Sequence, residues 1–111
     1  MKLPELKIGD LTAKIPVIQG GMGIGISLNR LAGTVAAEGG IGILSTAQIG
    51  FQEENFQRAS VRTNLQTIKK QLDKARSFAK GGILGFNVMV ASFRYDDVVR
   101  ATVEAGADVI I

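Results

Sequence analysis

Residues 16–25 read PVIQGGMGIG, a short and largely apolar stretch followed at once by a glycine-rich bend. Proline at the first position costs little because a strand start needs no N–H there, so residues 16–19 are expected to form a short buried strand. Ser27 is the expected N-cap of a helix whose apolar residues recur at spacings of three and four. Gly39 and Gly40 end that helix. The stretch therefore predicts one strand–bend–helix unit of a parallel sheet.

The alternation of strand and helix continues along the chain. The expected elements are a strand at 41–44, a helix at 61–79, a strand at 84–90, a helix at 95–104 and a strand at 108–111. A loop over residues 47–60 is long enough to suggest a functional role. Gly9-Asp10, between alternating apolar residues, predicts a β-hairpin over residues 6–15.

Strands that alternate with amphipathic helices pair in parallel, which places the chain in the α/β class. Four such units are half of an eight-unit barrel. We expect residues 1–111 to be the N-terminal half of a (β/α)8 TIM barrel with a leading β-hairpin. The single domain is expected to continue beyond residue 111, because an apolar parallel strand at 108–111 would otherwise leave an uncovered edge.

Composition excludes several kinds of chemistry. The chain has 13 Lys plus Arg, 10 Asp plus Glu and a net charge of +3, with 46% hydrophobic residues, which is a globular balance. With no Cys and no His, these residues hold no disulfide, thiolate or imidazole metal ligand, cysteine nucleophile or histidine base. Basic residues without interleaved aromatics predict no nucleic-acid partner, and short apolar runs predict no membrane partner. A cytoplasmic protein is expected.

The carboxyl ends of parallel strands share one edge of a sheet, and ligands of α/β folds bind there. Gly21, Met22 and Gly23 follow the first expected strand. Main chain without side chains can lie against a flat ligand and present N–H groups to it. Alternatively, the glycines make a tight turn that needs positive φ. The spacing leaves both interpretations open.

Asn87 interrupts the third apolar strand, and a buried amide must find hydrogen-bond partners. Its partners could be the polar edge of a heteroaromatic ring or a neighbouring strand. Gln19 has the same two interpretations, or fills a layer of the barrel. Ser45 and Thr46 are expected to cap a helix or a turn, with contact to a ligand as the alternative. No pair of carboxylates has a spacing that suggests acid–base catalysis, so no catalytic residue and no metal ligand is assigned.

Four short motifs occur in a familiar order and spacing: PVIQGGMG at 16–23, AEGGIG at 37–42, GFNVM at 85–89 and EAGAD at 104–108. Together they resemble the nitronate monooxygenase family, formerly called 2-nitropropane dioxygenase. That family also includes flavin-dependent enoyl-acyl-carrier-protein reductases. The resemblance implies an FMN-binding TIM barrel in which Gly21, Met22, Gly23 and Asn87 contact the flavin.

The resemblance further implies an oxidoreductase that oxidises a small-molecule alkyl nitronate with O2. An enoyl-thioester reductase that uses NAD(P)H shares the same motifs. The family's catalytic histidine and phosphate-binding loops lie beyond this segment, so we expect these 111 residues alone neither to bind FMN tightly nor to turn over. Two other interpretations stay open: a non-catalytic half-barrel that pairs with itself as a homo-oligomer or with a second half, and a domain that binds phosphate or a nucleotide.

Overall fold

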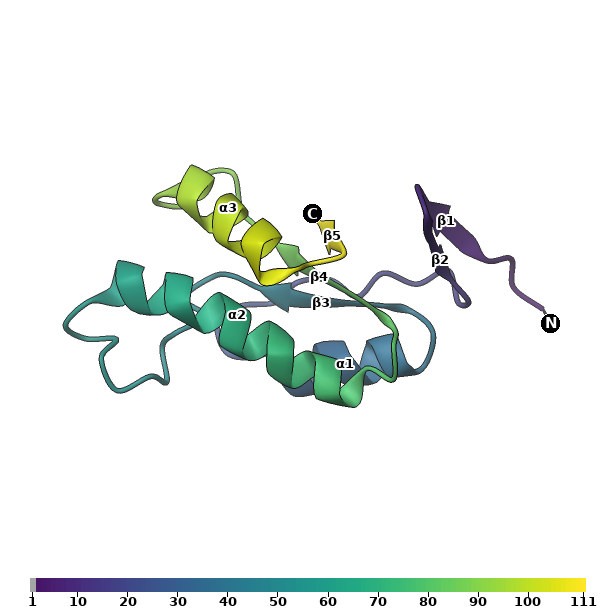
Figure 1. The fold of residues 1–111 in the computed structure, drawn as a ribbon, viewed down its shortest axis with the longest axis horizontal. Coiled ribbons are helices and arrows are strands. Elements are labelled where there is room, and N and C mark those ends of the chain that lie inside the picture. The colour runs from purple at the N-terminus through teal and green to yellow at the C-terminus, as the bar shows by residue number, and fades with distance from the viewer. Residues whose placement is uncertain (1) are drawn as a thin grey trace.

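In residues 2–111, the part of the chain that the computed structural model describes, three helices and two sheets form a mixed α/β domain (Figure 1). The larger sheet is parallel, with strand order β3-β4-β5. Its strands and helices are α1 (Asn29–Ala37), β3 (Ile41–Ser45), α2 (Ser60–Phe78), β4 (Ile83–Asn87), α3 (Tyr95–Ala105) and β5 (Val109–Ile110). The expected α/β class is confirmed, as is the order of the elements from residue 29 onward, and barrel closure stays a prediction.

The expected strand at residues 16–19 is wrong as a full strand. Only Ile18 pairs, through an isolated parallel bridge to Ile41. The stretch nevertheless lies beside β3, because Ile41 N donates to Val17 O at 2.9 Å and Gln19 N donates to Ile41 O at 3.1 Å. The four segments therefore follow one another across the sheet in chain order.

The expected strand at 84–90 is also too long, since β4 ends at Asn87. Val88 still donates its N–H to Ile111 O at 2.8 Å, but Met89 and Val90 leave the sheet and are exposed. An apolar run alone cannot show where the ladder of hydrogen bonds stops. Among residues 2–111, no helix is both long and apolar enough to cross a bilayer.

The two faces of the sheet bury different partners. Leu44, Leu84 and Phe86 join the cluster formed with the helices, to which α2 contributes Ile68, Leu72 and Ala75. Full burial of such a side chain stabilises the fold by about 1.5–3 kcal/mol. Neighbouring residues of a strand point to opposite faces of the sheet. The residues that alternate with Leu44, Leu84 and Phe86 along β3 and β4 therefore point to the face away from the helices.

That second face is covered at its amino-terminal end by the hairpin of β1 (Leu6–Ile8) and β2 (Leu11–Ala13). Ala13 is buried against Ile41 and Ile43. The hairpin expected over residues 6–15 is thereby confirmed. It lies at the end of the sheet opposite to the loops that follow β3 and β4 (Figure 1), so it leaves the carboxyl ends of the strands open.

Helix α1 lies close to β3 because small residues face each other across the contact. A Cβ atom on Gly42 would overlap the carbonyl oxygen of Ala32, and one on Gly33 would lie 2.7 Å from Ala75 O in α2. Ala32 is fully buried. These close approaches hold α1 against both β3 and α2.

A polar contact ties α2 to the segment before β5. Arg76 donates to the Asp108 carboxylate at 2.8 Å, and the same carboxylate oxygen accepts from Leu84 N at 3.0 Å. Burial alone would raise the pKa of Asp108, but the hydrogen bonds from Arg76 and Leu84, with the guanidinium charge, outweigh it and lower the pKa below its ordinary value.

We expect Asp108→Asn to lower the free energy of unfolding at neutral pH by about 1 kcal/mol, a modest effect because both partners reach solvent. A lowered pKa in the folded state stabilises the fold above the unfolded pKa of about 3.9 and loses that contribution as the pH falls through the folded value. Urea unfolding as a function of pH should show the difference between the two proteins shrinking on acidification.

Asp73→Asn is the matched control, because Asp73 forms an exposed i,i+4 pair with Lys69 on the surface of α2. Its unfolding free energy should stay within about 0.5 kcal/mol of the unaltered chain. An Asp108→Asn deficit that persists unchanged at acid pH would contradict the assignment of the effect to the charged carboxylate.

Candidate functional site

The side chain of Gln19 takes the place of main chain beside β3. Its Oε1 accepts from Ile43 N at 3.2 Å, and its Nε2 donates to Ile43 O at 3.0 Å. Ile43 is fully buried, so its backbone groups must be paired within the protein. The amide satisfies both, and the main chain can turn away after Gln19. Of the interpretations given to Gln19 from the sequence, the structure shows the bond to a neighbouring strand and neither ligand contact nor barrel filling.

Ser27 holds the bend that follows. Its Oγ accepts from Gln19 Nε2 and from Met22 N, both at 2.9 Å, and donates to Gly20 O at 3.4 Å. A hydroxyl has one donor and two acceptor sites, so its hydrogen-bonding capacity is used in full. The Ser27 side chain is buried, which shields these bonds from water.

The expectation that Ser27 caps α1 is wrong. The N-cap position is Leu28, which makes no side-chain cap bond. The cap comes instead from α2, where Gln71 Oε1 accepts from Asn29 N at 3.1 Å and from Asn29 Nδ2 at 2.8 Å. These partners are 42 residues apart, so no local pattern in the sequence could have indicated the contact.

Gly21 and Asn87 lie against each other at the carboxyl edge of the sheet. A Cβ atom on Gly21 would overlap Asn87 Cβ and lie 2.9 Å from Asn87 Cγ. Gly23 is similarly close to the next turn, since its Cβ would lie 2.8 Å from that of Ala47. The structure thus brings the glycine bend and Asn87 together. In the run 20–25 only Gly25 has a positive φ, so Gly21 and Gly23 are required by close packing and not by turn geometry.

Most hydrogen-bond donors of the bend are free. Among residues 2–111, the backbone N–H groups of residues 20–26 have a single partner, because only Met22 donates, to Ser27. Within the same described range the side-chain amide of Asn87 makes no hydrogen bond, although its backbone carbonyl does. The site therefore offers several main-chain donors beside one amide that can both donate and accept.

The turn after β3 fixes the backbone of Asn87. Thr46 N and Thr46 Oγ1 both donate to Asn87 O, at 3.2 and 2.9 Å. Ser45 Oγ accepts from Ala47 N at 3.4 Å within the turn, as expected of a cap, whereas the Thr46 hydroxyl bonds to the end of β4. Met22 is 44% exposed and packs into no core, which leaves its thioether available at the surface of the bend.

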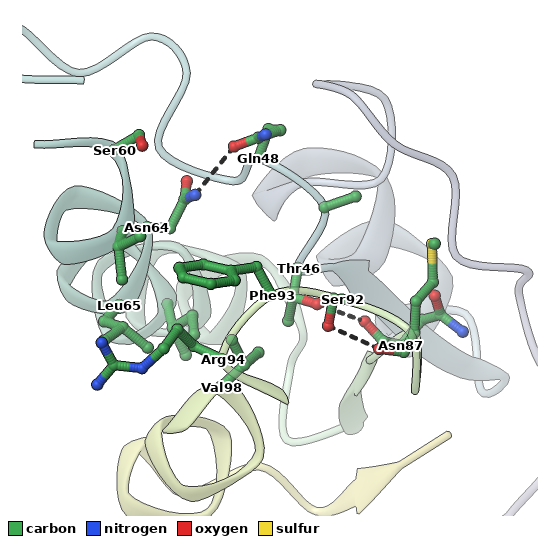
Figure 2. Close-up of a pocket in the computed structure, with 14 residues that line it drawn as sticks. Thr46, Gln48, Ser60, Asn64, Leu65, Asn87, Ser92, Phe93, Arg94 and Val98 are labelled. Carbon is green, nitrogen blue, oxygen red and sulfur yellow. Dashed lines mark hydrogen bonds between the residues drawn. The ribbon is translucent and has the colours of Figure 1, made fainter. Parts of the chain in front are cut away.

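A separate groove of about 300 Å³ lies between the loops after β3 and β4 (Figure 2). Leu65 and Ile68 of α2 and Val98 of α3 are among its apolar lining residues. Phe93 and Asn64 also line it (Figure 2). Asn87 lines this groove too, but residues 20–25 do not, so the groove adjoins the bend without containing it.

The chemistry of the bend is that of binding. Residues 19–27 and Asn87 carry no ionisable side chain. Among residues 2–111 there is also no group of three or more Asp or Glu side chains that could hold a metal ion. The arrangement can orient a ligand rich in hydrogen-bond acceptors, and it has no group that would move a proton.

Comparison with protein families gives one finding. A family model described as nitronate monooxygenase matches residues 5–107 of the 111. The matched range contains both the glycine bend and Asn87. No curated protein matches the chain.

We expect Gly21→Ala to destabilise the protein by about 1–3 kcal/mol, because the added methyl group overpacks the contact with Asn87. Urea unfolding measures the change. Gly20→Ala is the control, since a Cβ there meets nothing within 4 Å. Asn87→Gly in the same chain should recover part of the loss, and an equal loss at both glycines would contradict the packing role of Gly21.

Proposed function

The chain belongs to the nitronate monooxygenase family, a family of flavin-dependent oxidoreductases, and from that membership we propose that it oxidises alkyl nitronates with O2, as the N-terminal part of an FMN-binding TIM-barrel domain. Gly21, Met22, Gly23 and Asn87 are the proposed flavin contacts. The observation that carries the proposal is a row of backbone N–H groups at residues 20–21 and 23–26, which have no partner within residues 2–111, beside an Asn87 side-chain amide that also has none there.

These donors suit the polar edge of an isoalloxazine ring, where carbonyl oxygens and ring nitrogens accept hydrogen bonds and one N–H donates. Main-chain N–H groups can meet the acceptors, and an amide can pair with either kind of atom. Because the bend is exposed, its unpaired groups are solvated and can exchange water for a ligand without rearrangement of the core.

Bound flavin would supply the electron transfer of the reaction, with O2 as the final oxidant. The residues of this chain bind and orient. Fixed N–H donors favour an electron-rich partner and do not need to reorganise when charge on that partner increases. Thr46 limits the movement of Asn87 by holding its carbonyl with two hydrogen bonds.

The neutral character of the bend agrees with a nitronate as substrate. An alkyl nitronate is already the deprotonated form of a nitroalkane, so its oxidation does not require these residues to remove a proton. Reduction of an enoyl thioester, which the shared motifs also allow, consumes NAD(P)H and adds a proton to the product. Oxygen uptake with a nitronate and NAD(P)H oxidation with an enoyl thioester therefore distinguish the two activities in a flavin-loaded protein.

We expect FMN and riboflavin to perturb the same backbone resonances when titrated into the 15N-labelled chain, centred on Gly21, Gly23 and Asn87. Because the proposed contacts are to the ring and not to the phosphate, the two ligands should bind with similar affinity. Dissociation constants weaker than about 1 µM are expected, corresponding to a binding free energy smaller in magnitude than about 8 kcal/mol.

Asn87→Ala removes the amide but keeps the Cβ that Gly21 contacts, and it should weaken flavin binding by about two- to tenfold, as expected for one or two hydrogen bonds. Asn64→Ala is the matched control, because Asn64 carries the same amide on α2, where it bonds to Gly50 and Gln48. Perturbations that centre on the groove around Asn64, or on no defined set of residues, would overturn the proposed site.

A further inference from the structure

We propose that Gln19 is a positioning residue. Its side chain bonds to Ile43 O, the acceptor that the N–H of Gly21 would use in a regular strand, and so keeps that N–H free for a ligand. Ser27 then holds the released bend in place. The inference rests on the proposed flavin function for its purpose, while its decisive measurement needs no flavin.

The register of the sheet identifies the bond that is missing. In the parallel bridge between Ile18 and Ile41, Ile41 N donates to Val17 O and Ile41 O accepts from Gln19 N. Ile41 therefore bonds to the residues before and after Ile18. Continued by two residues, the same pattern would have Ile43 N donate to Gln19 O and Gly21 N donate to Ile43 O. A regular strand would thus consume the N–H of Gly21.

The structure shows the side-chain amide in place of both main-chain groups. Gln19 Oε1 accepts from Ile43 N, and Gln19 Nε2 donates to Ile43 O. A primary amide has the same donor and acceptor pair as a peptide unit, so the ladder of β3 loses nothing when the backbone departs. The N–H of Gly21, which has no partner among residues 2–111, is then available at the edge of the sheet.

Ser27 sets the direction of the released chain. Nε2 of Gln19 has a second hydrogen, which it donates to Ser27 Oγ at 2.9 Å, and the same oxygen accepts from Met22 N. One buried hydroxyl therefore couples the Gln19 amide to the residue that lies between Gly21 and Gly23. Because both of its acceptor sites are filled, Ser27 allows only a narrow range of bend conformations.

Amide hydrogen exchange of Gln19→Met, in the chain without flavin, tests this inference. Methionine has a similar length but no amide, so Ile43 O is left unpaired and the N–H of Gly21 should pair with it. Protection of Gly21 against exchange should therefore rise by about two- to tenfold, the effect of one hydrogen bond. A side chain that only stabilised the fold would produce the opposite sign, since its loss would lower protection throughout.

Gln71→Met is the matched control, because it makes the same substitution at a buried glutamine whose side chain caps α1 through hydrogen bonds from Asn29. In Gln71→Met, the protection of the Gly21 N–H against hydrogen exchange should equal that in the unaltered chain. Exchange at Gly21 that is as fast in Gln19→Met as in the unaltered chain would overturn the proposal.

Should Gln19→Met fail to fold, the unaltered chain gives a second measurement. Its Gln19 side-chain NH2 should exchange more slowly than that of the exposed Gln52, and equal rates would overturn the proposal.

The flavin titration separates the two inferences. Raised protection of Gly21 in Gln19→Met supports the role of Gln19 even if the unaltered chain binds no flavin. An absence of flavin binding would count against the proposed function alone.

Discussion

The site depends on the requirement that a buried strand have its backbone polar groups paired. Ile43 lies in the middle of β3 and is fully buried, so its N–H and C=O must find partners on the open side of the strand. An unpaired buried group costs about 1–3 kcal/mol. The Gln19 amide meets that requirement with a side chain, and only for this reason can the backbone leave the sheet where it does. The exposed donors of the bend are a consequence of this single substitution of side chain for main chain.

The pattern of apolar residues predicted the elements well because it reports burial directly. The helix expected at 61–79 is α2, Ser60–Phe78, and the strand expected at 41–44 is β3, Ile41–Ser45. Helices and strands of this kind are decided by local periodicity, which the sequence carries in full. The meeting of Gly21 with Asn87 also followed from a general rule, since both lie where parallel strands end.

Other features could not be predicted because they depend on which of several possible partners a polar side chain meets in the folded protein. Residues 16–19 have the composition of a strand, but the Gln19 side chain reaches Ile43 and replaces the main chain there. Ser27 has the character of a helix cap, but Met22 and Gln19 occupy its hydroxyl. The Gln19 side chain bonds to Ile43, which is 24 residues away, and Ser27 bonds to Met22 and Gln19, which are five and eight residues away, instead of to the first turn of the helix. Neighbouring residues in the sequence do not show which partner is nearer.

The use of main-chain donors at the bend has a consequence for how such a site can change during evolution. A peptide N–H is present in every residue except proline, so ordinary substitutions at residues 20–26 cannot delete the groups that the surface offers. Such substitutions can only change the direction in which these N–H groups point. Selection for a different ligand would therefore act most effectively on the residues beneath, Gln19 and Ser27, whose alteration would redirect the whole row of donors together.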